Sequence, residues 1–280
     1  MSTHAKLSPS SAYRWLACPG SVREEAKYPE PPSGPGAIDG THSHTLLEHC
    51  IKGNGDPLKM VGIKLKDHEG EFVVDRARAD RVAQALTYAR QRAGFLGVMR
   101  AETRVQPAHL LGRDDMSGTC DIQIQDPEVL EIIDYKDGMN EVVAADNPQL
   151  ELYALGVLAG FKLPVNGDYG FQRVRMTIIQ PKLALKGVPI ITSHELTIPE
   201  IMGKIGKFVA GAAATDNPDA PLVFGSHCKY CKHKSCSTRA GDVIKEMGMS
   251  FPVLNQPVDP VAELSQQAAD LDPNTMTPEK

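Results

Sequence analysis

The sequence lacks the features that would place a protein in a membrane or outside the cell. No run of apolar residues in its 280 positions approaches the roughly 18 needed for a transmembrane helix. The first ten residues contain no apolar segment behind Lys6, so a signal peptide is not expected. These two absences predict a cytoplasmic protein without a membrane partner.

An excess of basic charge is also missing. The formal net charge of −5 argues against a protein that coats nucleic acid through charge alone. A DNA enzyme remains compatible with this charge, because carboxylates at a metal site and an acidic tail can outweigh one basic face. The composition, 41% hydrophobic and 23% charged, is that of a globular protein with a substantial core.

Cysteines are few, and structural disulfides between them are not expected, because the cytoplasm keeps thiols reduced. Cys50 and Cys120 stand alone in apolar surroundings and are interpreted as ordinary buried residues. The other four are divided between the two ends of the chain, and their spacing is the informative feature.

Three of these cysteines, Cys228, Cys231 and Cys236, lie in a short segment that also contains several lysines. Three thiolates need a fourth ligand to complete a zinc or iron–sulfur site. Cys18, about 210 residues earlier, can be that ligand only if the two chain ends meet. Two histidines of the same segment are further candidate zinc ligands, His227 and His233.

The hydrophobic patterning predicts one α/β domain over residues 1–240. Strand patterns occupy 98–106, 119–125, 129–135 and 170–179. Helices are expected at 8–17, 41–51, 75–92 and 146–158, with a last one starting at the capping box Thr197-Ile198-Pro199-Glu200. This order of elements predicts a mixed sheet flanked by helices, in which a three-strand meander is joined to a βαβ crossover.

Two segments are expected to lack regular structure. Residues 28–40 are dense in proline and glycine and predict a loop. Residues 241–280 form a C-terminal tail, which is expected to be disordered from about residue 255 because its composition gives little to bury.

Two aspartates and a lysine lie at the ends of neighbouring predicted strands. Asp134 and Lys136 have period-2 spacing, so they project from the same face, and Asp121 falls near an end of the adjacent strand of the meander. Two carboxylates and a backbone carbonyl suit Mg²⁺, while a lysine there can orient or deprotonate an attacking water. Glu102 could approach from the preceding strand. The alternative is that these are solvated residues at strand ends.

Four segments together resemble the motif set of the RecB-like branch of the PD-(D/E)XK nuclease superfamily. They are Gly40-Thr41-His42-Ser43-His44 with Glu48, Gly118-Thr119-Cys120-Asp121, Asp134-Tyr135-Lys136, and Gln149-Leu150-Glu151-Leu152-Tyr153. All four occur in the order of that family and cover roughly residues 40–155. One departure is Cys120, which stands where the family's nominal motif has proline.

The resemblance implies a restriction-endonuclease-like core that hydrolyses DNA with Mg²⁺ or Mn²⁺. It implies a set of metal ligands: His44, Asp121, Asp134 and the backbone carbonyl of Tyr135. Lys136 would be the catalytic lysine. Gln149 and Tyr153, at i and i+4 of one helix, would converge on the cleft and touch the DNA backbone or the lysine. Alternatives remain: His44 as a surface histidine with His42 in its place, and Tyr153 as a core residue.

One early cysteine and three late ones also resemble the iron–sulfur staple of several RecB-type nucleases. That layout implies a 4Fe–4S cluster on Cys18, Cys228, Cys231 and Cys236, joining the N- and C-terminal ends; zinc and uncoordinated thiols are the alternatives. The basic segments 76–92 and 229–239 are candidate contacts to the DNA backbone.

The family analogy favours an exonuclease in recombination, repair or phage DNA processing. Two alternatives stay open: a structure-specific endonuclease, and a noncatalytic nucleic-acid-binding scaffold with a degenerate nuclease fold. The presence of all three of Asp121, Asp134 and Lys136 argues against the scaffold, because a binding module has no need of them.

Overall fold

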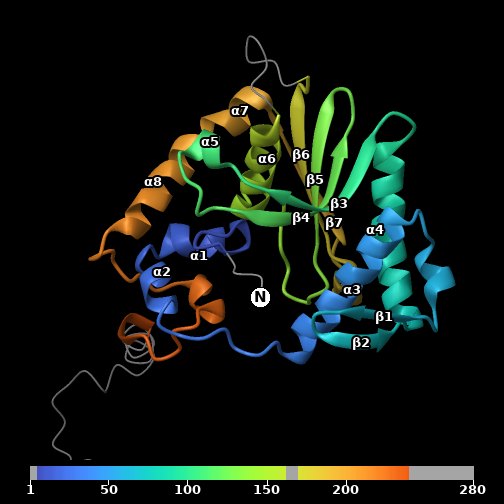
Figure 1. The fold of residues 1–280 in the computed structure, drawn as a ribbon, viewed down its shortest axis with the longest axis horizontal. Coiled ribbons are helices and arrows are strands. Elements are labelled where there is room, and N and C mark those ends of the chain that lie inside the picture. The colour runs from blue at the N-terminus through green and yellow to red at the C-terminus, as the bar shows by residue number, and fades with distance from the viewer. Residues whose placement is uncertain (1–4, 162–169, 240–280) are drawn as a thin grey trace, which may run out of the picture.

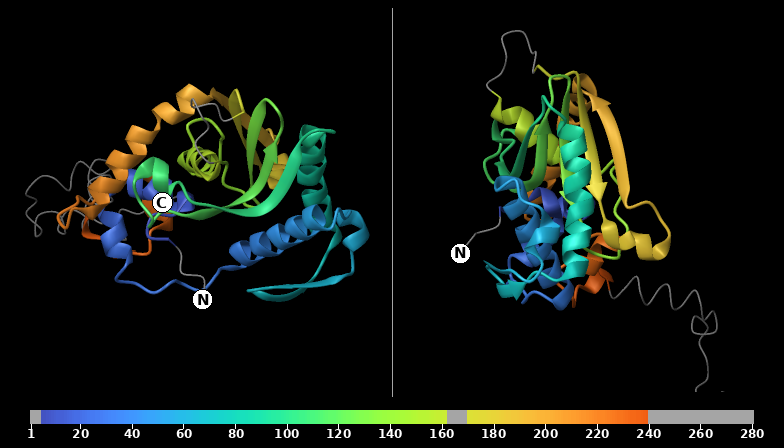
Figure 2. Two further views of the ribbon diagram at one scale, coloured as in Figure 1. Left: turned by 45° about the horizontal axis from the view of Figure 1, so that its top comes forward. Right: turned by 90° about the vertical axis from the view of Figure 1, so that its right-hand side faces the viewer.

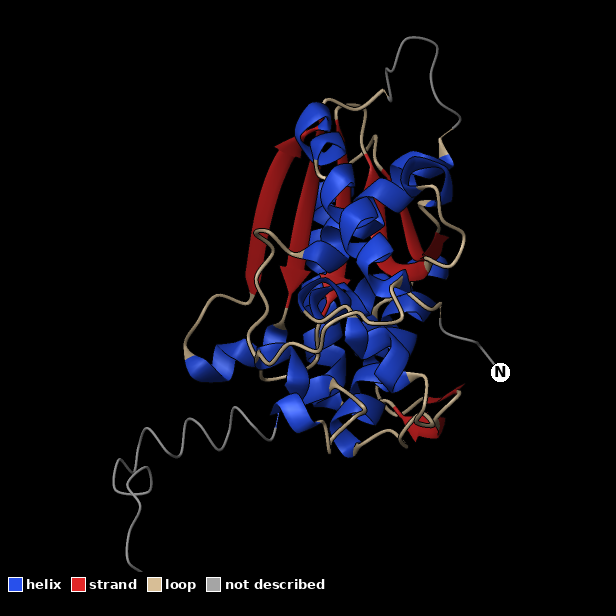
Figure 3. Cartoon of the chain, turned by 90° about the vertical axis from the view of Figure 1, so that its left-hand side faces the viewer, coloured by secondary structure: helices blue, strands red, loops and turns tan. Residues whose placement is uncertain are grey.

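The computed structural model describes residues 5–161 and 170–239, and the predicted C-terminal tail lies outside them. The chain is an α/β protein with a five-stranded mixed sheet flanked by helices (Figure 1), which confirms the predicted fold class at that level. A two-stranded hairpin stands apart from this sheet (Figure 3). Within the described ranges, no helix has both the length and the apolar character to cross a membrane.

The main sheet has the order β3-β4-β5-β6-β7. Its strands are β3 (Val98–Val105), β4 (Gly118–Gln125), β5 (Val129–Tyr135), β6 (Arg173–Ile179) and β7 (Ile191–Thr197). All neighbours are antiparallel except β5 and β6, which are parallel and connected through helix α6 (Pro148–Gly160). The predicted meander and crossover are therefore confirmed, whereas the half-exposed edge strand β7 was not predicted.

The remaining elements follow the chain around this sheet. In the N-terminal half they are η1 (Pro9–Ser11), α1 (Ala12–Ala17), α2 (Gly20–Glu25), α3 (Pro35–Lys52), η2 (Pro57–Met60), β1 (Lys64–Asp67), β2 (Gly70–Val73) and α4 (Arg76–Ala93). Those after β3 are α5 (Ala108–Leu111), η3 (Pro181–Lys186), α7 (Ile198–Gly203), α8 (Ile205–Asp216) and η4 (Ser226–Tyr230).

Each face of the sheet buries its own hydrophobic core. Leu130 and Ile132 of β5 pack in one cluster with α6, α1 and α8, whereas Ile133 and Tyr135 pack in a second cluster with α3 and α4. This alternation is the period-2 pattern of a strand buried on both sides. Figure 2 shows the sheet between the yellow-green helix α6 and the blue and teal helices α3 and α4.

Helix α3 begins earlier than its sequence pattern suggested. Residues 28–40 were expected to be a loop, but the helix starts at Pro35, with Pro35 at the first helical position and extended Gly34 as its N-cap. Proline is favoured there because its missing N–H would be unpaired anyway. The correction matters because it places Asp39 in the helix, on the side that faces α4.

Helix α6 begins at Pro148, two residues after the start of the predicted range 146–158. Asn147 is its N-cap, and the Asn147 side chain accepts hydrogen bonds from the amides of Gln149 and Leu150. Asp146 has a φ of 50° and so turns the chain into the helix. The cap fixes the first turn of α6, from which Gln149 reaches the end of β5.

The N-terminal helices meet the C-terminal part of the described chain. The amide of Gly20, at the start of α2, donates to the carbonyl of Pro221 (3.1 Å), and the amide of Lys232 donates to the Glu25 carboxylate (2.8 Å). A side chain at Gly20 would lie 2.6 Å from the carbonyl of Ala220, so only glycine permits this approach. In Figure 1 the blue helices α1 and α2 accordingly lie beside the orange-red segment.

Candidate metal centre and cysteine site

Three side chains from three elements converge at one end of β4. The ligand atoms of His44 (α3), Glu102 (β3) and Asp121 (β4) all lie within 4.8 Å of one another. Nδ1 of His44 is 3.6 Å from the Asp121 carboxylate and 3.9 Å from that of Glu102. One nitrogen and two carboxylates at this spacing form a donor set that a divalent cation can bridge.

Glu102 takes an unusual backbone conformation to reach this group. Its φ of 48° lies in the left-handed region, which costs free energy for a residue with a side chain. The neighbouring pairs Ala101–Ile122 and Thr103–Cys120 keep normal register on either side, so Glu102 stands opposite Asp121. Strain of this kind, confined to one residue inside a strand, is typical of functional sites.

Asp134 and Lys136 lie beside this group and are linked through α6. The Lys136 ammonium is 2.8 Å from Oδ2 of Asp134 and donates to the side-chain oxygen of Gln149 (3.2 Å). The Gln149 amide in turn donates to Oδ1 of Asp134 (2.8 Å) and lies 3.1 Å from the Tyr153 hydroxyl. The structure thus brings together the predicted residues of β5 and α6.

One oxygen of the Asp134 carboxylate, Oδ2, is paired with the Lys136 ammonium but has no well-aligned hydrogen bond. The residue is 2% exposed. A buried carboxylate oxygen without a full complement of donors is costly unless a cation or a ligand completes it. Asp134 is not part of the closest three-residue group, but its charge acts on Asp121.

Crowded negative charge is the electrostatic character of the site. Burial, and next the Asp121 carboxylate, raise the pKa of Glu102 to about 7. Burial raises the pKa of Asp121 to about 6, with His44 opposing and Asp134 adding to the shift. Burial alone would lower the pKa of Lys136, but Asp134 and Asp121 raise it above its usual value. The residues present therefore fit a divalent cation, which would favour the charged carboxylates.

Two backbone features hold Asp121 in place. The backbone group of Tyr135 that contacts Asp121 is its N–H, which donates to the carboxylate (2.7 Å), and not the carbonyl that was expected to bind a metal. A side chain at Gly118 would lie 2.9 Å from Pro9 and 3.0 Å from the Tyr153 ring. The glycine of the G-T-C-D segment is needed for this close packing of η1 and α6 on β4.

The two histidines of α3 have different surroundings, and these distinguish between the alternatives for a ligand. His42 points to the hairpin, where its Nδ1 is 2.7 Å from Asp67 and its ring stacks on Phe72 at 4.1 Å. His44 faces the carboxylates instead. Glu48, the last residue of that predicted motif, pairs with Lys52 on the helix surface. His44 is thus the histidine placed to bind a metal.

Glu102 was only a secondary candidate from the sequence, as a residue that could approach from the strand before Asp121, and it was not in the predicted ligand set. The structure places it in the closest group of possible ligands. The signal that would have identified it is register, because an antiparallel meander places Glu102 across from Asp121. Its left-handed φ had no indication in the sequence.

The four predicted cysteines line one enclosed cavity between the two chain ends. Cys18, Cys228, Cys231 and Cys236 all border it, and Cys18 is 5% exposed. The Cys18 sulfur accepts from the amide of Val223 at 3.3 Å. None of the four is joined to another cysteine by a disulfide.

The spacing of possible ligands in this cavity is wider than at the acidic residues. In the described part of the chain, only His44, Glu102 and Asp121 bring three ligand atoms within 4.8 Å of one another. His227 is engaged elsewhere, with its Nε2 2.9 Å from the Val223 carbonyl. His233 stacks on Tyr28 at 5.1 Å, and its Nδ1 is 3.5 Å from Glu24.

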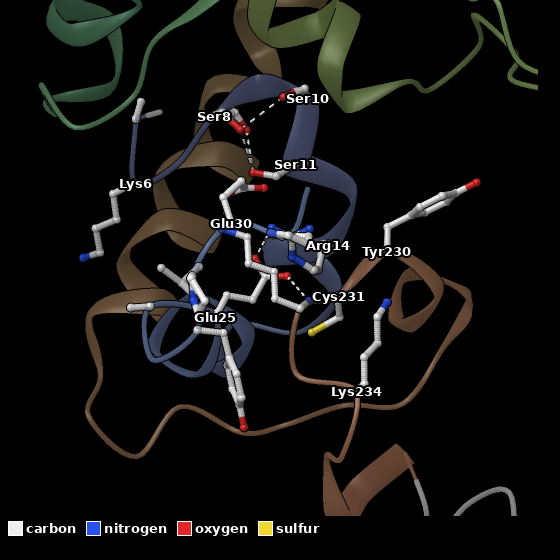
Figure 4. A pocket seen from close by; sticks show the side chains of 17 residues that line it. Lys6, Ser8, Ser10, Ser11, Arg14, Glu25, Glu30, Tyr230, Cys231 and Lys234 are labelled. Atoms are coloured by element: carbon white, nitrogen blue, oxygen red, sulfur yellow. Dashed lines mark hydrogen bonds and ion pairs between the residues drawn. The ribbon is translucent and has the colours of Figure 1, made fainter. Parts of the chain in front are cut away.

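An open cavity of about 860 Å³ lies beside the cysteine segment (Figure 4). One wall carries Ser8, Ser10, Ser11 and Arg14, and the other carries Tyr230, Cys231 and Lys234. Both walls contact elements that carry the acidic residues. Pro9 packs where a side chain of Gly118 would be, and Asn140, in the loop after Lys136, donates to the Tyr230 hydroxyl (2.9 Å).

The two basic segments differ in how their charges are used. In α4 the arginines pair with acidic residues of the protein itself: Arg76 with Asp80, Arg78 with Asp39 and Asp75, Arg81 with Asp39 and Asp137, and Arg92 with Glu131. Segment 229–239 is mixed: Lys232 pairs with Glu30, whereas Lys234 lines the open cavity and has no acidic partner in the described part of the chain. Lys234 is therefore the cation of this segment that is best placed to meet a ligand in the cavity.

Comparison with known proteins gives a family but no activity. A family described as "Protein of unknown function (DUF2800)" matches residues 4–273. The chain belongs to this family. A solved structure described as "Crystal structure of SSO0001" is similar over 85% of this chain and 89% of that chain, with 17% identity and a TM-score of 0.42.

Proposed function

We propose that this member of the DUF2800 family is a nuclease that hydrolyses phosphodiester bonds in DNA with Mg²⁺ or Mn²⁺. The observation that carries the proposal is the approach of His44, Glu102 and Asp121 to within 4.8 Å, beside buried Asp134 and Lys136. These residues would hold the cation with Asp134 as a further ligand. A cation bound there supplies charge that polarises a phosphate and makes water a better nucleophile.

The protein's own groups would then orient the reaction. Lys136 is held between Asp134 and Gln149, so its ammonium has a fixed position from which to orient the attacking water or neutralise charge on the phosphate. Gln149 binds Asp134 and Lys136 at once and is itself held by Tyr153. Gln149 and Tyr153 therefore hold the Lys136 ammonium in a fixed position relative to the Asp134 carboxylate.

DNA is the proposed substrate because of the RecB-like order of the four motifs, which also suggests an exonuclease. The open cavity beside the cysteine segment supports it, since Lys234 and Tyr230 line this space and Tyr230 accepts a hydrogen bond from Asn140 in the loop that follows Lys136. Lysines and exposed aromatic rings are the side chains that bind nucleic-acid backbones and bases. The nuclease-like character of the fold is part of this proposal.

The four cysteines are proposed to hold a 4Fe–4S cluster. Zinc, with bonds of about 2.3 Å to tetrahedral thiolates, needs sulfur atoms roughly 3.8 Å apart. In the described part of the chain, no three of these cysteines bring their sulfur atoms within 4.8 Å of one another. The support for the iron–sulfur cluster is the layout of one early and three late cysteines, all of which line the same cavity. A brown protein with iron and inorganic sulfide would support the cluster, and bound zinc alone would contradict it.

The direct test of the function uses purified protein on linear, circular and single-stranded DNA with Mg²⁺, Mn²⁺ or EDTA. Cleavage of linear DNA from its ends, dependent on the cation, is the expected result. Cutting of closed circles would instead identify an endonuclease. DNA binding without cleavage under every condition would favour the noncatalytic scaffold. That outcome is disfavoured by the buried charge of Asp134, which a scaffold would maintain at a cost in stability.

A further inference from the structure

A buried polar network lies behind the acidic centre and is not used by the proposed chemistry. Its central residue is Asp137, directly after Lys136, whose side chain is fully buried. Arg81 of α4 donates to both of its oxygens, at 2.8 and 3.0 Å. Lys182 of η3 lies 3.5 Å away. A carboxylate so surrounded by cations is held in one orientation.

The same carboxylate contacts helix α3 one residue before the metal-binding histidine. The hydroxyl of Ser43, which is 0% exposed, donates to Oδ2 of Asp137 at 2.7 Å. A second contact comes from Tyr135, whose hydroxyl donates to Oδ1 of Asp137 (3.3 Å). The Tyr135 ring packs edge-on against the His44 ring, with centroids 5.4 Å apart. Asp137 therefore binds two residues that contact or adjoin His44: Ser43, which precedes it in the chain, and Tyr135, whose ring packs against it.

We propose that Asp137 is a positioning residue that holds His44 against Asp121 and Glu102. This role rests on the proposed metal centre, and it explains how the position of His44 relative to the two carboxylates is set. Asp121 and Glu102 are placed by paired strands, whereas His44 comes from a helix on another layer. Ser43 and Tyr135 join that helix to the end of β5 through Asp137, so the histidine keeps its distance from the carboxylates. Residues that orient a metal ligand in this way typically affect affinity 10–100-fold.

The test measures Mn²⁺ binding by the full-length protein, by calorimetry, in the absence of DNA. Asp137→Asn keeps the side-chain shape and is expected to weaken Mn²⁺ binding about tenfold. In a His44→Ala background the same substitution should cause no further loss, because the histidine it positions is already gone. Unchanged Mn²⁺ affinity in Asp137→Asn, or an equal loss with and without His44, would overturn the role.

Glu131 provides a matched control in β5, six residues before Asp137, and it contacts the same helix α4. Like Asp137 it is a buried carboxylate that binds an arginine of α4, Arg92 at 2.9 Å, and a tyrosine hydroxyl, Tyr88 at 2.8 Å. Glu131 has no contact with α3 among the hydrogen bonds and ion pairs of the described chain. Glu131→Gln should lower the melting temperature but leave Mn²⁺ affinity unchanged; if it weakens binding as much as Asp137→Asn does, general destabilisation explains both.

A milder pair of variants keeps the test open if Asp137→Asn does not fold. Ser43→Ala removes one hydroxyl that binds Asp137, and Thr45→Ala removes a neighbouring one that binds Asp67 at 3.2 Å. Only Ser43→Ala should weaken Mn²⁺ binding. Equal affinities for the two variants would contradict the positioning role while the metal centre stands. A wild-type protein that does not bind Mn²⁺ at all would remove the metal centre itself, and the role of Asp137 with it.

Discussion

The acidic centre and the cysteine site are built in opposite ways. The three carboxylates of the acidic centre, Glu102, Asp121 and Asp134, come from adjacent strands, so the hydrogen-bond ladder of the sheet already places them. The helices α3 and α6 pack on this sheet and add His44 and Gln149. The cysteines come from positions about 210 residues apart and meet only where the chain ends pack together. A site made by a sheet can exist before its ligand arrives, whereas a site made by chain ends gains much of its order from the ligand.

Contacts around the two sites show the same difference. The acidic centre is backed by the buried hydrogen bond between Ser43 and Asp137 and by the part-buried one between Gln149 and Asp134. The cysteine segment is tied to the rest mainly by partly exposed contacts, including Lys232 to Glu25 and Asn140 to Tyr230. Removing a cofactor should therefore affect the stability of one region much more than that of the other.

The largest expected effect is loss of the cysteine cofactor. Cys18→Ser and Cys231→Ser should each empty the site and lower the melting temperature equally. By the chain-entropy model, a cross-link over about 210 residues contributes several kcal/mol, somewhat more than the roughly 4.7 for 100 residues. The double variant should be scarcely worse than either single one, as measured by metal content and thermal unfolding.

Two further measurements on these variants bear on the comparison. Cys50→Ala, at a buried cysteine outside the cavity, should keep the full cofactor content. Cys18→Ser should still bind Mn²⁺ at the acidic centre with nearly normal affinity. A Cys18→Ser protein that retains all its iron or zinc would show that Cys18 is not a ligand, and one that loses Mn²⁺ binding would show that the two sites are not independent.

Lys136→Ala should act on rate rather than on metal binding. The lysine is expected to act on water and phosphate, and groups of this kind contribute on the order of 10²–10⁴-fold to the rate. Single-turnover cleavage and Mn²⁺ titration of the same preparation separate the two effects. Lys52→Ala, at an exposed lysine of α3, is the control. Full rescue of Lys136→Ala by excess Mg²⁺ would reduce the residue to a supporting role.

Glu102→Gln should weaken Mn²⁺ binding, with a smaller effect on the fold. The substitution keeps the side-chain volume and removes a carboxylate whose pKa is raised by burial and next by the Asp121 carboxylate. We expect a loss of roughly tenfold or more in Mn²⁺ affinity, because a ligand is lost. Calorimetry of Glu102→Gln beside Glu128→Gln, at the exposed β4–β5 turn, measures it. Equal affinities would exclude Glu102 from the ligand set.

The smallest expected effect is at the link between the two regions. Asn140 donates to Tyr230 and accepts from Lys229 (3.2 Å), both in the cysteine segment. Exposed hydrogen bonds contribute about 0.5–1.5 kcal/mol each at most, so Asn140→Ala should lower the melting temperature only slightly. Mn²⁺ affinity and cofactor content should not change. A large loss of either would mean that the two regions are coupled through this residue.

Periodicity and caps were sufficient to predict the parts of the fold that position the acids. The apolar alternation of β4 and β5 and the proline-led start of α6 depend on local sequence, and they place Asp121, Asp134 and Gln149 close together. The edge strand β7 and the hairpin β1–β2 are half exposed, so their hydrophobic signal is weak. The early start of α3 was hidden by glycines that the helix tolerates.

The rest of the site depends on tertiary contacts that no local pattern contains. Glu102 reaches the group only through a left-handed φ, and Asp137 meets Ser43 across 94 positions. Each is a close contact between residues from different segments of the chain. They could be found only after the register of the sheet and the position of α3 were known.

The central claim is that the carboxylates around Asp121 and Asp134 form a metal-dependent nuclease centre. The most direct measurement is cleavage of end-labelled linear DNA by wild type and Asp134→Ala, each with Mg²⁺, Mn²⁺ or EDTA, with DNA binding and melting temperature measured in parallel. The account predicts cation-dependent cleavage by the wild type, and an Asp134→Ala protein that is folded, binds DNA at least as well and does not cut. Near-normal cleavage by Asp134→Ala, or cleavage by the wild type that EDTA does not stop, would contradict it.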